Sequence, residues 1–332
     1  MLEKTMKQIL NKKINDWFNT IEDDAVLAAI KKDLIITGGC FTSLIQNEKP
    51  NDFDCYFRTK ETLLLVANYY VNIWNKTHKD QENKIGSKTK VFVLDGENPS
   101  TELLDYYNIK QLSDSKSRMI SNTPADRVKI IFPSDGVVGN TEDIKMPADE
   151  LDSNDIINFL DDLDNISSEE KDIKKYKPVF ITTNAISLSD KIQLIIRFYG
   201  DSEEIHKNFD FEHTKSYYDF GENKLVIPKS VYEYTTNKTL KYTGSLYPVC
   251  SLFRLRKFIK RGWTINAGQI LKISMQISEL NLLDIDVLEE QLIGVDSIYF
   301  ANLIKQFNVS KSNNPDFVLN CSYVISIIDK IF

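Results

Sequence analysis

The chain has 332 residues, of which 42% are hydrophobic and 27% are charged, and its formal net charge is −7. This length and composition predict a globular protein with a large core, organised in two domains. No stretch approaches the roughly 18 apolar residues of a membrane span, and the charged N-terminus lacks the apolar segment of a secretory signal. The four scattered cysteines have no disulfide or metal-ligand spacing. We therefore expect a cytosolic protein with no membrane partner.

The first sixty residues predict two helices followed by a strand–helix–strand unit. Apolar side chains recur at near-helical spacing from Met6 to Trp17, and 23–32 forms a second short amphipathic run. A β-like run at 34–37 then stops at two glycines, a helical piece covers 40–46, and a second strand is expected at 53–57.

The middle of the chain predicts a helix, two strands and an acidic insertion. The helix is expected at 60–76 and the strands at 91–94 and 128–132. Twelve acidic against two basic side chains give 141–172 a charge of −10, which leaves +3 for all other residues. The segment 141–175 shows no clear helical or strand period. We therefore interpret it as a solvated insertion with little core of its own, containing one helix around 155–163.

Regular structure is expected again from about residue 176. We predict regular structure over 179–188, a helix over 190–199 capped by Ser189, and strands at 211–217 and 224–227. The patterns after residue 248 are helical, and the helices are expected at 249–261, 264–280, 284–293 and 296–306. The order predicts an α/β (α+β) domain over 1–235, with a mixed sheet flanked by helices, and an all-helical domain over 236–332.

The helical part begins with a basic segment. Residues 241–278 carry seven basic side chains and no acid. Arg254, Lys257 and Arg261 are spaced i, i+3 and i+7, so they line one face of a helix, and Lys260 lies beside them. Such a row binds a triphosphate or the backbone of a nucleic acid. A solvated helix face with no ligand is the alternative.

The segment LIITGGCFTSLIQNEKPNDFDCYF indicates chemistry. Because side chains alternate along a strand, Asp52 and Asp54 share one face, while Phe53 and Cys55 face the core. Two carboxylates this close repel each other unless a cation lies between them. Mg²⁺ prefers hard oxygen ligands and keeps part of its shell for water and substrate phosphates, so we predict Asp52 and Asp54 as metal ligands.

The glycines and a third acid complete the predicted site. Gly38 and Gly39 expose backbone N–H groups at a helix start, where a triphosphate can approach, and Ser43 adds a hydroxyl. Two-metal phosphoryl transfer usually needs a third carboxylate from a distant part of the chain. Asp210 is the preferred candidate and Glu212 the rival, whereas we expect the nearby His213 to pack in the core.

With these residues in place, the chain resembles the DNA polymerase beta-like nucleotidyltransferase superfamily. Gly38, Gly39, Asp52 and Asp54 match its strand–GG–helix–DxD motif, and the match of Asp210 is less specific. Two segments, 176–219 and 241–263, look like predicted nucleotidyltransferases of tailed bacteriophages and large viruses. The resemblance covers 33–57 and 176–263.

The resemblance implies transfer of a nucleoside monophosphate from a nucleoside triphosphate (NTP) to an acceptor hydroxyl, with release of pyrophosphate. It implies two Mg²⁺ or Mn²⁺ ions held by Asp52, Asp54 and Asp210. The basic segment favours an RNA acceptor, a tRNA 3′ end in particular, and a protein hydroxyl is the runner-up. A catalytically inactive nucleotide- or RNA-binding module and a structural component of the virion are further alternatives.

Overall fold

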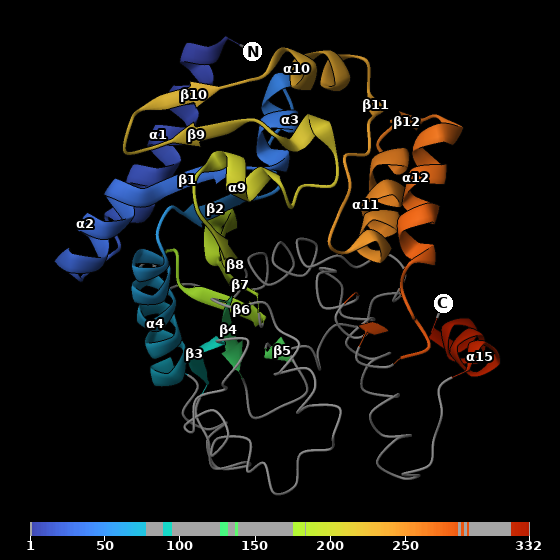
Figure 1. Cartoon of the computed structure of the whole chain (residues 1–332). Coiled ribbons are helices and arrows are strands. Elements are labelled where there is room, and N and C mark those ends of the chain that lie inside the picture. Colours follow the sequence, from blue (N-terminus) through green and yellow to red (C-terminus); the bar gives the residue numbers. More distant parts are fainter. Residues whose placement is uncertain are drawn as a thin grey trace, which may run out of the picture.

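A computed structural model describes residues 2–77, 89–94, 127–131, 137–138, 175–182, 184–284, 287–288, 291 and 320–331. Its largest feature is an eight-stranded sheet (Figure 1). The strands are β1 Leu34–Thr37, β2 Phe53–Phe57, β5 Val137–Val138, β6 Pro178–Thr182, β7 Ala185–Leu188, β8 Ile192–Tyr199, β9 Tyr217–Asp219 and β10 Lys224–Val226. Their order is β10-β9-β1-β2-β8-β7-β6-β5, and only the β2–β8 pair is parallel.

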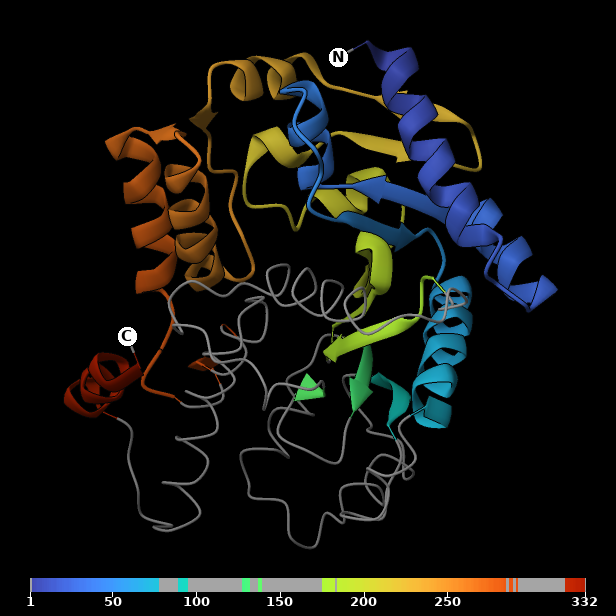
Figure 2. The ribbon, with the colours of Figure 1, turned by 180° about the vertical axis from the view of Figure 1, so that it is seen from behind.

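Three helices cover one face of the sheet, as Figure 2 shows from behind: α1 Glu3–Phe18, α2 Asp24–Asp33 and α4 Lys60–Thr77. The apolar stripe of α1 packs into the main core with alternate residues of the central strands, among them Cys55, Leu194 and Ile196. Trp17 Nε1 donates a hydrogen bond of 2.6 Å to the Tyr70 hydroxyl, which links α1 to α4. Burial of apolar side chains on this face therefore fixes which residues point to the opposite face.

The opposite face of the sheet is covered only in part. Ile35 of β1 and Tyr56 of β2 pack there against Ile205 of the short helix α9, Ser202–His206. The helix α3, Gly39–Ile45, connects β1 to β2, and a 3-10 helix at Glu212–Thr214 precedes β9. The strands β3 Lys90–Leu94 and β4 Arg127–Ile131 form a separate antiparallel pair.

The C-terminal part contains mostly helices, and a second core joins it to Phe211 of the preceding part. Its elements are α10 Lys229–Thr236, β11 Thr239–Leu240, α11 Pro248–Lys260, β12 Thr264–Ile265, α12 Ala267–Ser278 and α15 Cys321–Ile331. Side chains from α11 and α12 pack together with Phe211, Leu240, Tyr242 and Trp263. Because β11 and β12 form a short parallel pair, the prediction that this part is all-helical is wrong in that detail.

The mixed α/β character and the strand–helix–strand unit at 34–57 are confirmed. The helix predicted over 190–199 is wrong: Ser189–Lys191 is a 3-10 turn, with Asp190 at φ +59°, and 192–199 is strand β8. The strand predicted over 211–217 is also wrong, because Phe211 forms only an isolated bridge and a 3-10 helix follows it. The hydroxyl of Thr214 donates a hydrogen bond of 2.7 Å to the Phe211 carbonyl. This carbonyl therefore has a partner within the turn, in place of one on a neighbouring strand.

Several predictions concern residues that the structure does not describe. The acidic insertion 141–175 with its helix at 155–163, and the helices at 284–293 and 296–306, lie wholly or largely outside the described residues. Within the described ranges, no helix has the length and apolar character that crossing a membrane requires. The four cysteines are unpaired as expected, and three are buried, whereas Cys321 is exposed.

Candidate functional site

The centre of the site is the junction between β1 and α3. The chain turns at Gly38 with φ +97°, and Thr37 just before it pairs with Asp54 on β2. A Cβ atom on Gly38 would lie 2.5 Å from Oδ2 of Asp54, whereas one on Gly39 would meet no atom within 4 Å. The backbone of Gly38 therefore lies directly against the Asp54 carboxylate, at a position that only glycine fills without strain.

The paired aspartates have the predicted alternation. Phe53 and Cys55 are buried in the main core, while Asp52 and Asp54 are partly exposed and line a cleft on the other face. Burial raises the pKa of the Cys40 thiol well above its ordinary value, and the Asp54 and Asp52 carboxylates raise this pKa further. The negative field of the two carboxylates thus extends to the start of α3.

Asp210 reaches the same cleft from the loop after α9, and its side chain is only 7% exposed. Its Oδ2 atom accepts hydrogen bonds from Arg254 Nη1 at 2.8 Å and from Ser251 Oγ at 3.0 Å. The rival, Glu212, accepts from Ser230 Oγ at 2.7 Å and pairs with Lys215, and it does not line the cleft. The structure therefore brings Asp210, and not Glu212, to the paired aspartates.

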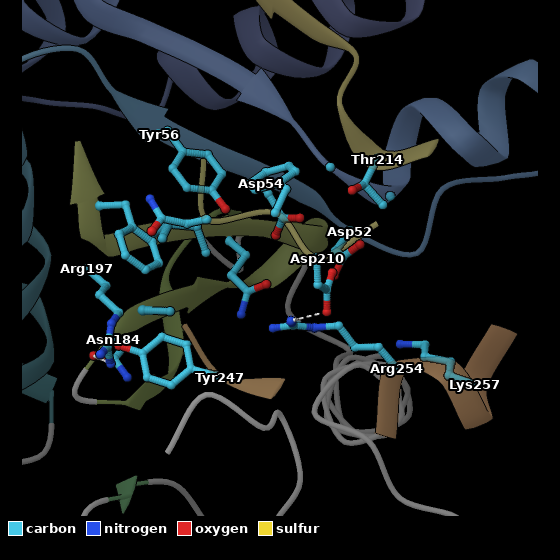
Figure 3. Close-up of a pocket in the computed structure, with 18 of the residues that line it drawn as sticks. Asp52, Asp54, Tyr56, Asn184, Arg197, Asp210, Thr214, Tyr247, Arg254 and Lys257 are labelled. Carbon is cyan, nitrogen blue, oxygen red and sulfur yellow. Dashed lines mark hydrogen bonds and ion pairs between the residues drawn. The ribbon is translucent and has the colours of Figure 1, made fainter. Parts of the chain in front are cut away.

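The predicted basic row lies across the cleft from the sheet. Arg254, Lys257 and Arg261 all line it, and Figure 3 shows Arg254 and Lys257 side by side below the three carboxylates. Arg261 Nη2 donates to Glu48 Oε2 at 2.9 Å and lies 3.5 Å from Ser43 Oγ, so it connects the end of α11 to α3 and the loop after it. Lys260 does not belong to this group, because it is exposed and lies outside the cleft.

The cleft has a volume of about 270 Å³ and extends along β8, away from the carboxylates. Gln193, Ile195 and Arg197 alternate toward it, while Ile192, Leu194 and Ile196 are buried in the core. Sequence reasoning missed this end of the cleft, which Arg197 forms together with Tyr56, Asn184 and Tyr247 (Figure 3). The alternation of polar and apolar residues in IQLIIRFY was the signal that could have revealed it.

His213, beside Asp210 in sequence, packs in the second core as expected. It is completely buried, with ring centroids 4.4 Å from Phe258 and 4.3 Å from Trp263. Its pKa is lowered to about 3, chiefly by burial; the Asp210 charge opposes this shift and the Arg261 charge adds to it. His213 is therefore a neutral packing residue beneath the site.

The donor set fits a divalent cation in part. Mg²⁺ is commonly held in proteins by one or two carboxylates, and water and substrate phosphates supply the other ligands. Asp52 and Asp54 meet this requirement, with the Gly38 backbone against one of them. Among the described residues, no three His, Cys, Asp or Glu side chains form a ready-made metal cluster, and Asp210 is bonded to Arg254 instead.

Comparison with known proteins agrees with the phage association expected from the sequence. A protein of Bacillus phage SPbetaL7 named "Gabija anti-defense 2" is 24% identical to the chain over 117 residues. The match covers 35% of this chain and 29% of the phage protein, so it spans less than a third of that relative. The model of the Gabija anti-defense 2 (Gad2) family matches residues 8–238, which include β1, α3, β2, β8 and Asp210. Since the family model matches more than half of this chain, the chain belongs to the Gabija anti-defense 2 family.

Proposed function

We propose that the chain is a metal-dependent nucleotidyltransferase with a fold of the polymerase-beta type. The observation that carries the proposal is a cleft with acidic and basic walls. Asp52 and Asp54 project from one wall beside the glycine turn, and the basic row of α11 lines the other. A metal–triphosphate carries both charges, so it complements both walls, whereas a cation or an anion alone complements one.

In the proposed reaction, the oxygen of an acceptor hydroxyl attacks the α-phosphorus of an NTP. The bond from this phosphorus to the α,β-bridging oxygen breaks, pyrophosphate leaves, and the hydroxyl proton passes to a carboxylate, for which Asp210 is our candidate. A divalent cation held by Asp52 and Asp54 would neutralise charge on the phosphates. Arg254, Lys257 and Arg261 stabilise the charge that develops on the phosphoryl oxygens, since positioning and electrostatics supply most of the catalysis in such transfers.

The glycine turn and the start of α3 bind phosphate in this scheme. Gly39 is the first residue of α3, where backbone N–H groups lack partners within the helix and favour an anion. No side chain lies above Gly39, and the Ser43 hydroxyl lines the same part of the cleft. Arg261, which lies near Ser43, contributes its positive charge from the opposite wall.

The acceptor is proposed to be a nucleic-acid hydroxyl, an RNA or tRNA 3′ end, with a protein hydroxyl as the runner-up. The basic side chains face into the cleft, where a triphosphate already accounts for them, so they support the RNA acceptor only weakly. The family name, Gabija anti-defense 2, supports a role against a defence system. Modification of a component of such a system is compatible with either acceptor.

A second candidate is a nucleotide-binding module without turnover. One observation favours it: the Asp210 carboxylate is neutralised by Arg254, and no three-acid cluster is formed among the described residues. For transfer, Arg254 has to turn from Asp210 to the phosphates. A module that only binds nucleotide has no such requirement.

The test supplies each α-labelled NTP in turn with Mg²⁺ or Mn²⁺, total RNA and cell lysate, and compares the wild type with the Asp52→Ala/Asp54→Ala double variant. Label transferred by the wild type alone supports the enzyme, and its removal by RNase or by protease identifies the acceptor class. Binding of labelled NTP without any transfer, by protein shown to be folded, would instead support the second candidate.

A further inference from the structure

The far end of the cleft holds a buried amide with unused hydrogen-bonding capacity. Asn184, between β6 and β7, is 9% exposed and lines the cleft. Its Oδ1 atom accepts from Arg197 Nη1 at 3.3 Å, which fixes the orientation of the amide, while Nδ2 has no hydrogen-bond partner among the described residues. A buried amide donor without a partner costs free energy, so such a group indicates a ligand that supplies the acceptor.

Arg197 gives this end of the cleft its shape. Its side chain is 8% exposed, and its guanidinium lies 4.1 Å from the centroid of the Tyr247 ring. A cation over an aromatic face is attracted to the ring, so Tyr247 helps to hold the guanidinium in place. Asn184 Nδ2 and the guanidinium are both donors, so the pair recognises neighbouring acceptor atoms.

The distance from the carboxylates matches the length of a nucleotide. Gln193 pairs with Asp54 in the sheet, and Arg197 follows four residues later on the same face of β8. At a rise of about 3.3 Å per residue, Arg197 lies about 13 Å along the strand from the level of Asp54. An extended nucleotide with its phosphates at the carboxylates places its base near Arg197.

We propose that Asn184 and Arg197 bind the base of the nucleotide and select guanine, while Tyr247 holds the Arg197 guanidinium in place, an inference that rests on the proposed function. Guanine presents two neighbouring acceptors, O6 and N7, which match one donor from Asn184 Nδ2 and one from the Arg197 guanidinium. Adenine has an amino donor in place of O6, and this donor would face the donors of the protein. On the corresponding edge, cytosine presents an amino donor and uracil presents the single acceptor O4.

The proposal is tested by equilibrium binding of the four NTPs and of inorganic tripolyphosphate to the full chain with Mg²⁺. The wild type is expected to bind GTP at least tenfold more tightly than ATP. Asn184→Asp, which keeps the shape of the side chain but removes its donors, is expected to abolish this preference and leave tripolyphosphate binding unchanged. Tyr247→Leu, which removes the ring beside the Arg197 guanidinium, is expected to reduce the preference for GTP without affecting tripolyphosphate binding.

The outcomes separate this proposal from the function on which it rests. Equal affinity for all four NTPs, or a preference for another base, overturns the guanine site while leaving the phosphate site intact. Absence of binding to any NTP and to tripolyphosphate overturns both. Thermal unfolding of Asn184→Asp shows that it is folded, and an unchanged GTP preference in the folded variant also overturns the proposal.

Discussion

The cleft has two walls that differ in charge and in the structure that holds their side chains in place. The sheet wall carries Asp54 on β2, a central strand with hydrogen-bonded neighbours on both sides, and Asp52 directly before this strand. The helical wall carries the basic row on α11, which rests on a small core of aromatic side chains that includes His213. Asp210 lies between the walls and is paired with the helical one through Arg254.

This difference assigns distinct tasks to the walls. The strands fix the position of the sheet wall closely, which suits carboxylates that have to hold a cation in a defined place beside the reacting phosphates. The helical wall meets the cleft through long Arg and Lys side chains, which can adjust to a charged ligand. Substitutions in the sheet wall should therefore reduce the transfer rate most, and substitutions in the helical wall should weaken nucleotide binding as well as slow transfer.

The largest effect on transfer is expected from a change to the Asp54 carboxylate of the sheet wall. Asp54→Asn keeps the size of the side chain but removes its charge, so transfer should fall on the order of a thousandfold as metal and phosphate charge lose their stabilisation. The measurement is the rate of label transfer at saturating metal. Asp201→Asn, at the N-cap of α9 and outside the cleft, is the matched control and should retain wild-type transfer. A fully active Asp54→Asn would falsify the role of the sheet wall.

The glycine turn should show a large effect at one position and a small one at the next. Gly38→Ala introduces a Cβ that collides with the Asp54 carboxylate at a φ of +97°, so we expect a loss of about 1–3 kcal/mol in unfolding free energy and roughly hundredfold slower transfer. Gly39→Ala meets open space within a helix, and its stability should equal or slightly exceed that of the wild type. Chemical denaturation of both variants checks this contrast, and equal destabilisation of the two would contradict it.

The helical wall offers a matched pair of lysines. Lys257 lines the cleft and Lys260 lies outside it, three residues further along α11. Lys257→Ala should weaken NTP binding about tenfold, which corresponds to loss of one charge-assisted contact of roughly 1.4 kcal/mol. Lys260→Ala should leave the affinity unchanged. Titration of a fluorescent NTP measures both, and an equal loss for the two variants would show that only the overall charge of α11 matters.

How much of this site was predictable depends on how local each part is. The glycine turn, Asp52 and Asp54 lie within seventeen residues, 38–54, and alternation along one strand sufficed to place them. The face shared by Arg254, Lys257 and Arg261 follows equally from helical spacing. Lys260 was misplaced because proximity in sequence does not put a residue on the same helix face.

The parts that sequence reasoning missed are held together by tertiary contacts. Residues 192–199 are apolar enough to suit a short helix or a strand. Gln193 and Arg197 are the only polar signs of alternation, so the pairing of β8 with β2 and β7 decides between the two. A helix over 190–199 does not place the Arg197 side chain on the face of the sheet that lines the cleft. Its contacts with Asn184 and Tyr247 join the β6–β7 loop, β8 and the start of α11, which no local pattern connects.

The smallest effect on chemistry, and the clearest on stability, is expected beneath the helical wall. His213 is neutral in the folded protein because burial lowers its pKa to about 3, whereas an unfolded histidine titrates near 6.5. Between these values the unfolded state binds more protons, so unfolding free energy falls as pH drops below about 6.5, by roughly 3 kcal/mol at pH 4.

His213→Phe keeps the aromatic packing and removes two buried ring nitrogens that lack partners among the described residues. This variant should lose less stability between pH 7 and pH 4, as measured by denaturant unfolding, and should retain NTP affinity. An identical acid sensitivity would assign the loss to other groups, such as His206, whose pKa is lowered to about 4 by burial and by Lys215.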